Sequence, residues 1–361
     1  MNLEAIRAEF PVLERKAYLN AGTFGPLPRR SAEAGARWTQ RALEDGRTGH
    51  DFFEEALGLR DEARRRIARL IGAEDGSLAL VSSTTEGCDI VLAGLDLGPT
   101  DEVVTTDVEH PGLLGALRCS SARVRIAEVR DRPAAEALDA IRAELTDATR
   151  LVALSHVAWT TGAVLPVAKL AGAVPVLVDG AQSAGTIEVD VTALGCDFYT
   201  VSGQKWLLGP DTTGALYVRP DRVESLRLAA PSYLSWADPA ELEPWPDARR
   251  FESVWLAPGS LAGLVESLAL AEEAGEGRFA RTRAVAERCR ELLAAHADVV
   301  TEPGQATLVS FRPRGVEPDE VVARLASEDV VVRALPGCGW VRASCGFWTS
   351  EEDLERLVAV L

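Results

Sequence analysis

Lys205 is the side chain with the clearest chemical potential, because lysine is rare in this sequence. Only three of the 38 basic residues are lysines, namely Lys16, Lys169 and Lys205. An amine can lose its proton and form an imine with an aldehyde, whereas a guanidinium stays protonated and cannot. Lys16 and Lys169 lie in ordinary charged or helical surroundings, which is typical of surface lysines. Lys205 instead closes the segment Ser202-Gly203-Gln204-Lys205 after an apolar run, so we interpret it as a candidate nucleophile.

Asp179 is the second candidate, because it ends the apolar run Val174–Val178 and precedes Lys205 by 26 residues. Taken alone, a carboxylate at this position also suits helix capping or metal binding. If Asp179 and Lys205 end neighbouring strands, however, a carboxylate and an amine share one crevice. Pyridoxal phosphate needs this pair: the amine forms the imine, and the carboxylate keeps the pyridine nitrogen protonated so that the ring can accept electrons from Cα.

The elements that must position these residues are apolar runs that alternate with helical patterns. Between residues 78 and 218 the predicted strands are Leu78–Val81, Glu102–Thr105, Arg123–Val129, Leu151–Val157, Pro175–Val178, Phe198–Val201 and Ala215–Val218. Strands that alternate with helices favour an α/β fold with a mostly parallel sheet. Polar clusters follow several of these runs, and ligands of such sheets bind beyond the carboxyl ends of the strands. We therefore predict that one edge of the sheet carries the binding site.

The chain after residue 220 indicates a second, smaller domain. Residues 221–258 are rich in Pro, Trp and Ser, which is typical of an irregular connection. Beyond it, helices are predicted at 261–274, 278–296, 318–328 and 351–361, with strands at 307–311 and 330–333. We predict a large domain over residues 15–250, and a small α/β domain over residues 251–361 that also takes in residues 1–14.

Composition excludes several classes of protein. With 47% hydrophobic and 26% charged residues, the chain is an ordinary globular protein. Its net charge of -17 opposes binding to nucleic acid. No apolar run approaches the roughly 20 residues that span a bilayer, and the first residues show no apolar signal core, so we expect a cytoplasmic protein without membrane contact. The six cysteines lack CxxC spacing, and no GxGxxG or P-loop motif follows the first strand, which argues against a zinc site or a nucleotide-binding Rossmann fold.

Seven motifs in the same order resemble the class V aminotransferase family of pyridoxal-phosphate enzymes. This family includes cysteine desulfurases, carbon–sulfur lyases and isopenicillin N epimerase-like proteins. The motifs are Tyr18-Leu19-Asn20-Ala21-Gly22, Ser83-Thr84-Thr85-Glu86-Gly87, Glu109-His110, Ser155-His156-Val157, Val178-Asp179-Gly180-Ala181-Gln182, Cys196-Asp197-Phe198-Tyr199 with Ser202-Gly203-Gln204-Lys205, and Val341-Arg342-Ala343-Ser344 before Thr349-Ser350-Glu351-Glu352. The resemblance implies a fold-type I transferase that works as a homodimer with its site at the subunit interface.

The resemblance also implies roles for the residues around the cofactor ring. Lys205 would carry pyridoxal phosphate and, once freed by substrate, act as the base at Cα. Asp179 would pair with the pyridinium, and Gln182 would hydrogen-bond the ring hydroxyl. His110 would stack on the ring and shuttle protons, although it also suits the cap of a helix that begins near Pro111.

Four further residues are the candidates for the phosphate site. Thr84 and Thr85 stand where a strand turns into the predicted helix 86–95, and the N-terminus of a helix attracts a dianion. This Thr-Thr-Glu pattern is also an N-capping pattern, and the two uses are compatible. Ser202 and Gln204 would complete the phosphate site.

Three residues are the candidates for substrate binding. Arg342 would bind the substrate carboxylate through its bidentate fork, although an arginine can also be a surface charge. Asn20 would line the pocket. Trp159 or Thr160 stands where the family usually has Asn, so the pocket shape there departs from the family pattern.

The expected reaction is elimination or transfer of sulfur at Cβ of a cysteine-like L-amino acid. An aminotransferase or an amino-acid epimerase of the same family is the alternative, and a non-catalytic scaffold is disfavoured by the intact catalytic set. Cys338 follows Val332-Arg333 much as a persulfide-forming cysteine would, but only three residues separate it from Arg342. Cys338 is therefore either a sulfur acceptor or a small buried side chain. Val254-Trp255 stands where the family often has a Gly-Thr pair that contacts the phosphate in the partner subunit, so the contact across the subunits is expected to be altered or lost.

Overall fold

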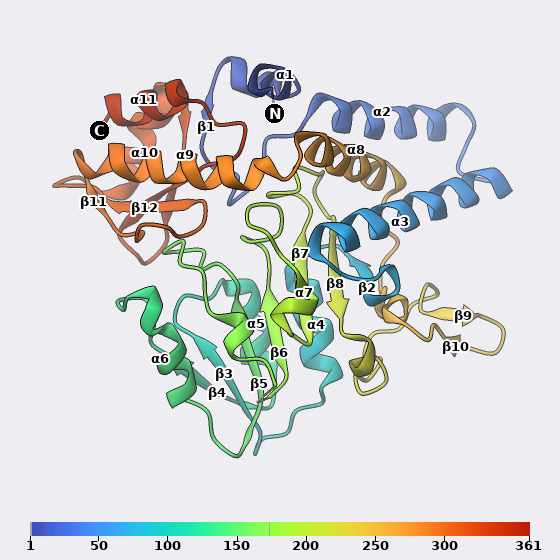
Figure 1. The fold of residues 1–361 in the computed structure, drawn as a ribbon. Coiled ribbons are helices and arrows are strands. Elements are labelled where there is room, and N and C mark those ends of the chain that lie inside the picture. The colour runs from blue at the N-terminus through green and yellow to red at the C-terminus, as the bar shows by residue number, and fades with distance from the viewer. Residues whose placement is uncertain (1, 173) are drawn as a thin grey trace.

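A seven-stranded sheet forms the centre of the larger part of the molecule (Figure 1). The computed structural model describes residues 2–172 and 174–361. The strands are β2 (Leu78–Val81), β3 (Glu102–Thr106), β4 (Arg123–Ala127), β5 (Thr149–Ser155), β6 (Val176–Asp179), β7 (Phe198–Ser202) and β8 (Gly214–Val218), in the order β2-β8-β7-β6-β5-β3-β4. Strand β8 runs antiparallel to β2 and β7, and the other pairs are parallel. The predicted α/β fold and mostly parallel sheet are therefore confirmed, with strand ends that differ by up to a few residues.

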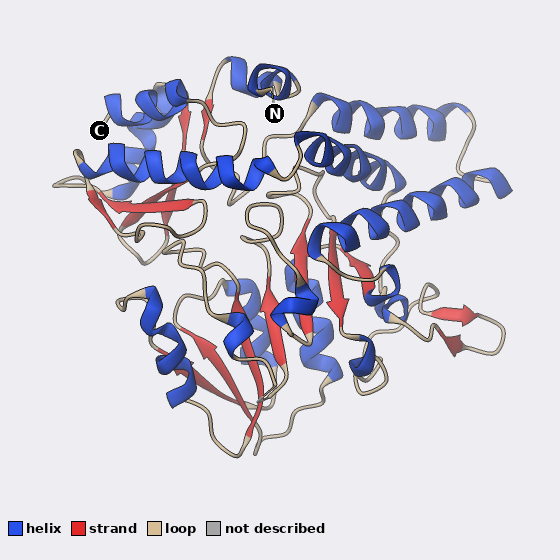
Figure 2. Ribbon diagram, in the orientation of Figure 1, coloured by secondary structure: helices blue, strands red, loops and turns tan. Residues whose placement is uncertain are grey.

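Helices cover both faces of this sheet (Figure 2). Side chains alternate between the faces along each strand, so that Val176 and Val178 join one core and Leu177 joins the other. The first core includes α3 (His50–Ile71), α6 (Ala137–Ala143) and α8 (Pro258–Ala274), and the second includes α4 (Thr84–Gly94) and α5 (Pro111–Cys119). A sheet that is covered on both faces explains why its strands are continuous apolar runs in the sequence.

A four-stranded antiparallel sheet forms the second, smaller part. Its order is β11 (Asp298–Val299), β12 (Leu308–Arg312), β15 (Trp340–Ser344) and β14 (Arg333–Leu335). Helices α9 (Gly277–Ala294), α10 (Pro318–Ser327) and α11 (Glu351–Ala359) share its hydrophobic core. The predicted small α/β unit is present, but its inner strand β15 was not predicted.

The N-terminal segment packs against this smaller part. Strand β1 (Ala17–Tyr18) pairs in parallel with β13 (Val330–Val331). Arg7 of α1 (Leu3–Ala8) donates to the Asp353 carboxylate of α11 at 2.6 Å, and Figure 1 shows α1 close to the C-terminal elements. Arg7 lies in the segment 1–14 that the sequence groups with the small domain, whereas β1 falls within the predicted large domain, so the division of the chain at residues 14 and 250 stays a prediction.

Helix α2 (Arg29–Glu44) packs against α8 and, with α3, forms a helical arm (Figure 1). The sequence interpretation did not predict α2. The remaining elements are short: α7 (Val191–Leu194), β9 (Trp236–Asp238), β10 (Glu243–Pro244) and the 3-10 turns Pro11–Glu14, Asp75–Ser77, Ala134–Glu136, Val167–Lys169, Pro220–Arg222 and Ala248–Phe251. Among the described residues, no helix has the length and apolar character that crossing a bilayer requires.

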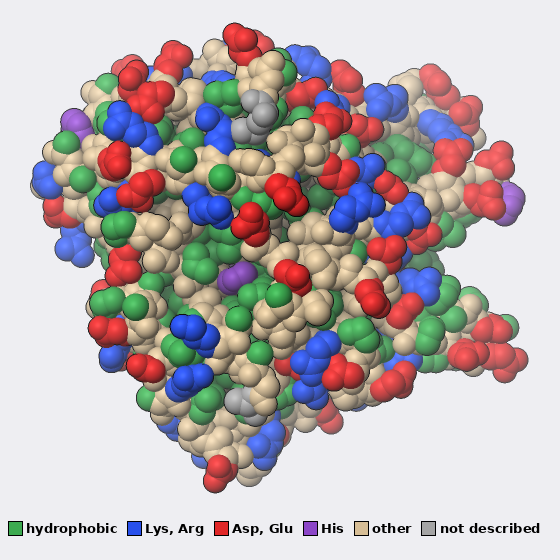
Figure 3. All heavy atoms as spheres, viewed as in Figure 1, with side chains coloured by type: hydrophobic (Ala, Val, Ile, Leu, Met, Phe, Trp, Pro, Cys, Tyr) green, Lys and Arg blue, Asp and Glu red, His purple; other side chains and the backbone are tan. Residues whose placement is uncertain are grey.

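Acidic and basic side chains are interspersed over the face shown in Figure 3. Hydrophobic side chains and a histidine gather near the middle of this face, between the two parts of the molecule. The carboxyl ends of the parallel strands point toward this junction, as Figure 1 shows.

Candidate active site

Strands β5, β6 and β7 end side by side and set the floor of a pocket. Their register places Ser155 opposite Asp179, and Asp179 opposite Thr200. The pocket is lined by His110, Ser155, Val157, Trp159, Asp179, Ala181, Gln182 and Lys205. Five of the eleven residues proposed from the sequence therefore meet in one cavity.

Lys205 lies in the turn after β7, and its amine has no bonding partner among the described residues. Burial lowers the pKa of Lys205 to about 8; Asp179 opposes this effect, and the guanidinium groups of Arg342 and Arg333 add to it. A neutral amine is therefore accessible near neutral pH, which is what a nucleophile or a base requires.

Asp179 presents one unused carboxylate oxygen to the pocket. Its Oδ1 accepts the backbone N–H of Ala181 at 2.9 Å, and its Oδ2 accepts no hydrogen bond from the described residues. Burial raises the pKa of Asp179, whereas Lys205 and the Ala181 N–H lower it. A buried carboxylate with an open oxygen suits a cationic N–H donor.

Gln182 ties the pocket to the N-terminal segment. Its Nε2 donates to the carbonyl oxygen of Gly22 at 2.8 Å, and its Oε1 accepts the indole N–H of Trp206 at 2.8 Å. Gly25 adds a second tie, because its N–H donates to the carbonyl of Gln204 at 2.8 Å. One amide hydrogen of Gln182 remains for a ligand.

His110 caps a helix and lines the pocket at the same time. Its Nδ1 accepts the backbone N–H of Gly112 at 3.1 Å, and Pro111 begins α5. Its ring centre lies 5.3 Å from that of Trp159. Burial, followed by the charges of Lys205 and two arginines, lowers the pKa of His110 to about 4. The imidazole is therefore neutral at neutral pH, and because Nδ1 accepts, its proton resides on Nε2.

The four candidates for phosphate binding lie at the start of α4 and at, or just after, the end of β7, outside the lining of this pocket. Ser83 caps α4 by accepting the N–H of Glu86 at 3.1 Å. The backbone N–H groups of Thr84 and Thr85 have no acceptor within residues 2–172 and 174–361. The Ser202 hydroxyl donates to the side-chain oxygen of Gln204 at 2.9 Å. This end of α4 therefore offers free donors of the kind that bind anions.

Arg342 and Arg333 form an uncompensated pair of cations. They face each other across β14 and β15, and the Nη groups of both donate to the Thr23 hydroxyl, at 3.4 and 3.2 Å respectively. Arg342 is fully buried, its Nη1 donates to the carbonyl of Trp159 at 2.8 Å, and its Nε has no partner. Neither guanidinium meets a carboxylate in the described parts of the molecule. Burial and Arg333 lower the pKa of Arg342 to about 9. A buried cation beside a half-buried one, without a counterion, indicates an anion site.

Asn20 is linked to this cation pair through the hydroxyl of Thr23. Its Oδ1 accepts the hydroxyl of Thr23 at 2.8 Å, and its backbone bridges to Ser344 of β15. The sequence interpretation missed Thr23 and Arg333. Arg333 had a usable signal, because a hairpin with a four-residue turn at 336–339 pairs it with Arg342. Thr23 had none.

The model of the family described as class-V aminotransferases matches residues 19–357. The chain belongs to the class V aminotransferase family. It is similar to isopenicillin N epimerase of Streptomyces clavuligerus, with 32% identity over 95% of this chain and 93% of the relative. A probable cysteine desulfurase of Halobacterium salinarum is 29% identical over 100% of this chain and 96% of the relative.

Solved structures agree with this class V assignment. The cystine C–S lyase C-DES in complex with its reaction product, cysteine persulfide, has a TM-score of 0.91 and 30% identity over 97% of this chain and 98% of that protein. A C-DES mutant with glycine covalently linked to its PLP cofactor also has a TM-score of 0.91 and 30% identity, with 98% of both proteins covered. The predicted family and fold type are therefore confirmed.

Cys338 of this class V protein lies in the tight turn between β14 and β15. Its N–H donates to the carbonyl of Leu335 at 3.2 Å, and its side chain packs with Trp159, Leu335 and Trp340. Burial raises the pKa of the Cys338 thiol, and the charge of Arg130 partly opposes this. The thiol is thus half-buried in a short hairpin, which resembles a packing role more than that of a mobile sulfur acceptor.

Proposed function

We propose that this protein is a pyridoxal-phosphate enzyme that acts at Cα of a small L-amino acid and breaks a carbon–sulfur bond at Cβ. The observation that carries the proposal is the unpartnered amine of Lys205 in one pocket with the open oxygen of Asp179. The similar protein C-DES supports it, because C-DES is a cystine C–S lyase and its mutant holds PLP.

The donors and acceptors around the pocket fit the ring of this cofactor. The amine of Lys205 would bind the aldehyde carbon of the cofactor, and Asp179 would accept a hydrogen bond from its protonated ring nitrogen. Gln182 has one amide hydrogen left to donate to the ring hydroxyl. His110 would cover its face. When bound, pyridoxal phosphate supplies an electron sink for a carbanion at Cα.

The free donors at the start of α4 fit its phosphate. Thr84 and Thr85 would contribute unpaired backbone N–H groups and hydroxyls, and Ser202 and Gln204 would contribute side chains. The positive end of the helix dipole favours a dianion there. We therefore propose that these four residues bind the phosphate.

The protein's own groups would orient the substrate and move one proton. The cation pair of Arg342 and Arg333 would bind the carboxylate in place of the Thr23 hydroxyl, which aims the Cα–H bond. Lys205 would remove that proton, because its amine titrates near neutral pH. His110 stays neutral and would donate a hydrogen bond from Nε2.

Release of the sulfur product directly to solution fits better than transfer to Cys338. A persulfide on this side chain would have to move with the β14–β15 hairpin, whose turn is fixed by the Cys338 N–H. The 32% identity to an isopenicillin N epimerase favours epimerisation as the second candidate. Both outcomes begin with loss of the same Cα proton, so the products distinguish them.

The test is a visible absorbance band after addition of pyridoxal phosphate, followed by product analysis. We expect Lys205→Ala to abolish the band and the activity. With L-cystine or L-cysteine, lyase action gives pyruvate, desulfuration gives alanine, transamination needs an oxo-acid, and epimerisation gives the D-amino acid. Failure of the wild type to take up the cofactor would overturn the proposal.

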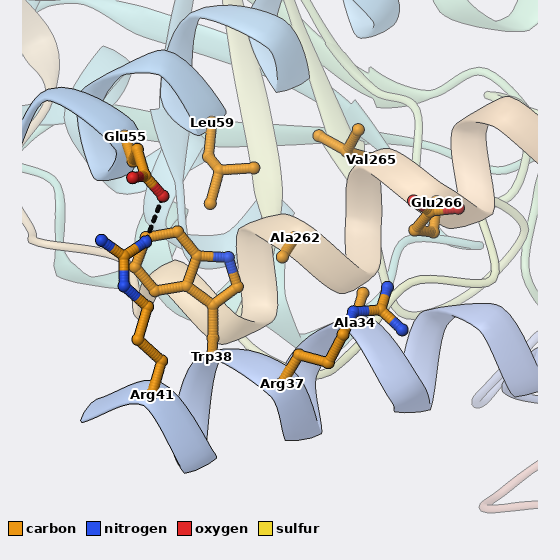
Figure 4. A pocket seen from close by; sticks show the side chains of 9 residues that line it. All are labelled: Ala34, Arg37, Trp38, Arg41, Glu55, Leu59, Ala262, Val265 and Glu266. Atoms are coloured by element: carbon orange, nitrogen blue, oxygen red, sulfur yellow. Dashed lines mark hydrogen bonds and ion pairs between the residues drawn. The ribbon is translucent and has the colours of Figure 1, made fainter. Parts of the chain in front are cut away.

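We further propose a homodimer that pairs through the helical arm. Large exposed apolar side chains lie on this arm, namely Leu43 of α2 and Phe53 and Leu57 of α3. A pocket between α2, α3 and α8 lies on the same arm, and Figure 4 shows its floor. Light scattering should show a dimer that Leu57→Glu dissociates, whereas Ile126→Glu on the far edge strand leaves it intact. A monomeric wild type would refute this surface.

A cytoplasmic location is part of the same proposal. All six cysteines are free thiols in the structure, which suits a reducing compartment. Cell fractionation tests it, and a secreted form would contradict it.

A further inference from the structure

A buried carboxyl group that the proposed chemistry leaves unused lies behind the pocket. Glu109 is 4% exposed and lies in the loop between β3 and α5. Its Oε1 accepts the hydroxyl of Thr106 at 2.6 Å, and its Oε2 accepts the N–H and the hydroxyl of Ser155 at 2.8 and 2.5 Å. No lysine or arginine contacts it in the described parts of the chain. Glu109 is thus held by three neutral donors and no cation.

Ser155 connects Glu109 to the pocket. It lines the cavity and is the cross-strand partner of Asp179 in the β5–β6 pair. Asp179 is itself buried, so two carboxyl groups share one water-poor cluster. Such groups repel each other and titrate as a coupled pair. Burial raises the pKa of the Cys88 thiol of α4, and the charges of both carboxyl groups raise it further.

We propose that Glu109 is a positioning residue for Asp179, and that its negative charge, set across Ser155, strengthens the hold of Asp179 on the protonated ring nitrogen of the cofactor. This inference rests on the proposed function. A second negative charge behind Asp179 raises the affinity of the cluster for a positive charge in front of it. Glu109 also directly precedes His110, whose ring centre lies 5.3 Å from that of Trp159.

The charge of Glu109 should switch within the working pH range. Burial raises its pKa to about 7, the donors from Ser155 and Thr106 lower it, and the charge of Asp179 raises it further. Glu109 is therefore charged above that pH and neutral below it. Its contribution to cofactor binding should appear only on the alkaline side.

The test compares Glu109→Gln with the wild type. The amide keeps the hydrogen bonds, because its oxygen accepts from Ser155 while its nitrogen donates to Thr106, and only the charge is lost. Tryptophan fluorescence gives the Kd of the cofactor-free protein for pyridoxal phosphate. We expect a variant to wild-type Kd ratio of about 1 at about pH 6 and of about 10 at about pH 8.5. Titrations of the phosphate and of Lys205 occur in both proteins and cancel in the ratio.

Two further variants keep the inference falsifiable. Glu102→Gln removes a carboxylate from the other end of β3, where Glu102 accepts from Thr146 at 2.6 Å, and should give a ratio of about 1 at both pH values. Glu109→Asp keeps a titrating carboxyl, so its ratio should not grow with pH. A pH-independent ratio for Glu109→Gln would overturn the role of the charge. A wild type that binds no pyridoxal phosphate would instead overturn the proposed function, and this inference with it.

Discussion

Lys205 should lower the stability of the cofactor-free protein, and its replacement by methionine should raise it. The pocket holds the ammonium group away from water and gives it no hydrogen-bond acceptor among the described residues. Methionine has an unbranched side chain that is one heavy atom shorter than that of lysine, and it carries no charge. We therefore expect Lys205→Met to be inactive and more stable than the wild type, which is the reverse of most buried substitutions.

The magnitude follows from the depressed pKa. The change from the ordinary value of 10.5 to about 8 corresponds to roughly 3 kcal/mol of unfavourable free energy for the charged form. Below about pH 8 the folded and unfolded proteins both carry the proton, so the whole of this cost is present. Between about pH 8 and about pH 10.5 the unfolded protein alone is protonated, so the stability of the wild type rises with pH. The advantage of Lys205→Met should therefore be up to about 3 kcal/mol at pH 7 and should shrink toward about pH 10.5.

Urea unfolding of both cofactor-free proteins at several pH values measures this difference. Lys169→Met is the matched control, because Lys169 is exposed and the same substitution there removes a surface charge. That control should change the free energy of unfolding by less than about 0.5 kcal/mol. The reasoning is refuted if Lys205→Met is no more stable than the wild type at pH 7, or if its advantage does not depend on pH.

Three further predictions concern other parts of the molecule. Arg342→Lys should lower kcat/KM for an amino-acid substrate by about 100-fold, because a lysine cannot copy the bidentate fork; steady-state product formation checks this, and an unchanged value contradicts it. Cys338→Ser should release pyruvate at a rate within about twofold of the wild-type rate, because the thiol has a packing role. Loss of turnover in that assay would instead indicate that Cys338 is a sulfur acceptor. Glu252→Gln should destabilise the fold by about 3 kcal/mol or more in urea, because Glu252 is buried between Arg60 and Arg64. A Glu252→Gln protein as stable as the wild type would show that the ion pairs of Glu252 with the two arginines do not stabilise the fold.

The sequence predicted the large sheet well, because a sheet covered on both faces has strands that are apolar throughout. Strand β15 was not predicted because its sequence is not apolar throughout. Arg342, a charged residue, occupies its centre and is nevertheless fully buried. Helix α2 was also missed, since its pattern is strongly polar and only a narrow stripe, including Ser31 and Ala34, is buried. Burial of polar residues depends on tertiary contacts that local patterns do not contain.

In the candidate site, too, some residues could be predicted from the sequence and others could not. Asp179 ends a strand, and Lys205 and His110 follow strands, so the rule that ligands bind beyond strand ends brings them together from sequence alone. Thr23 and Glu109 act through hydrogen bonds between segments far apart in the chain, such as Glu109 to Ser155. Such contacts depend on packing and leave no spacing signal. The spacing of motifs therefore predicts which residues line the pocket, and the structure is needed to identify what holds those residues in place.

The outcome of the reaction should be decided on the side of the pocket that the smaller part of the molecule supplies. The floor, with Asp179 and Lys205, comes from the large sheet, and in the proposed function it would serve the loss of the Cα proton. Arg333 and Arg342 come from β14 and β15, and both donate hydrogen bonds to the Thr23 hydroxyl. A substrate carboxylate bound by these arginines, as proposed, would displace that hydroxyl, which also donates to Asn20 in the segment held by Gln182 through Gly22. Substrate binding would thus change contacts that join both parts of the molecule. We therefore expect this segment, and not the strand ends, to set the orientation of the Cβ substituent and with it the choice between elimination and reprotonation.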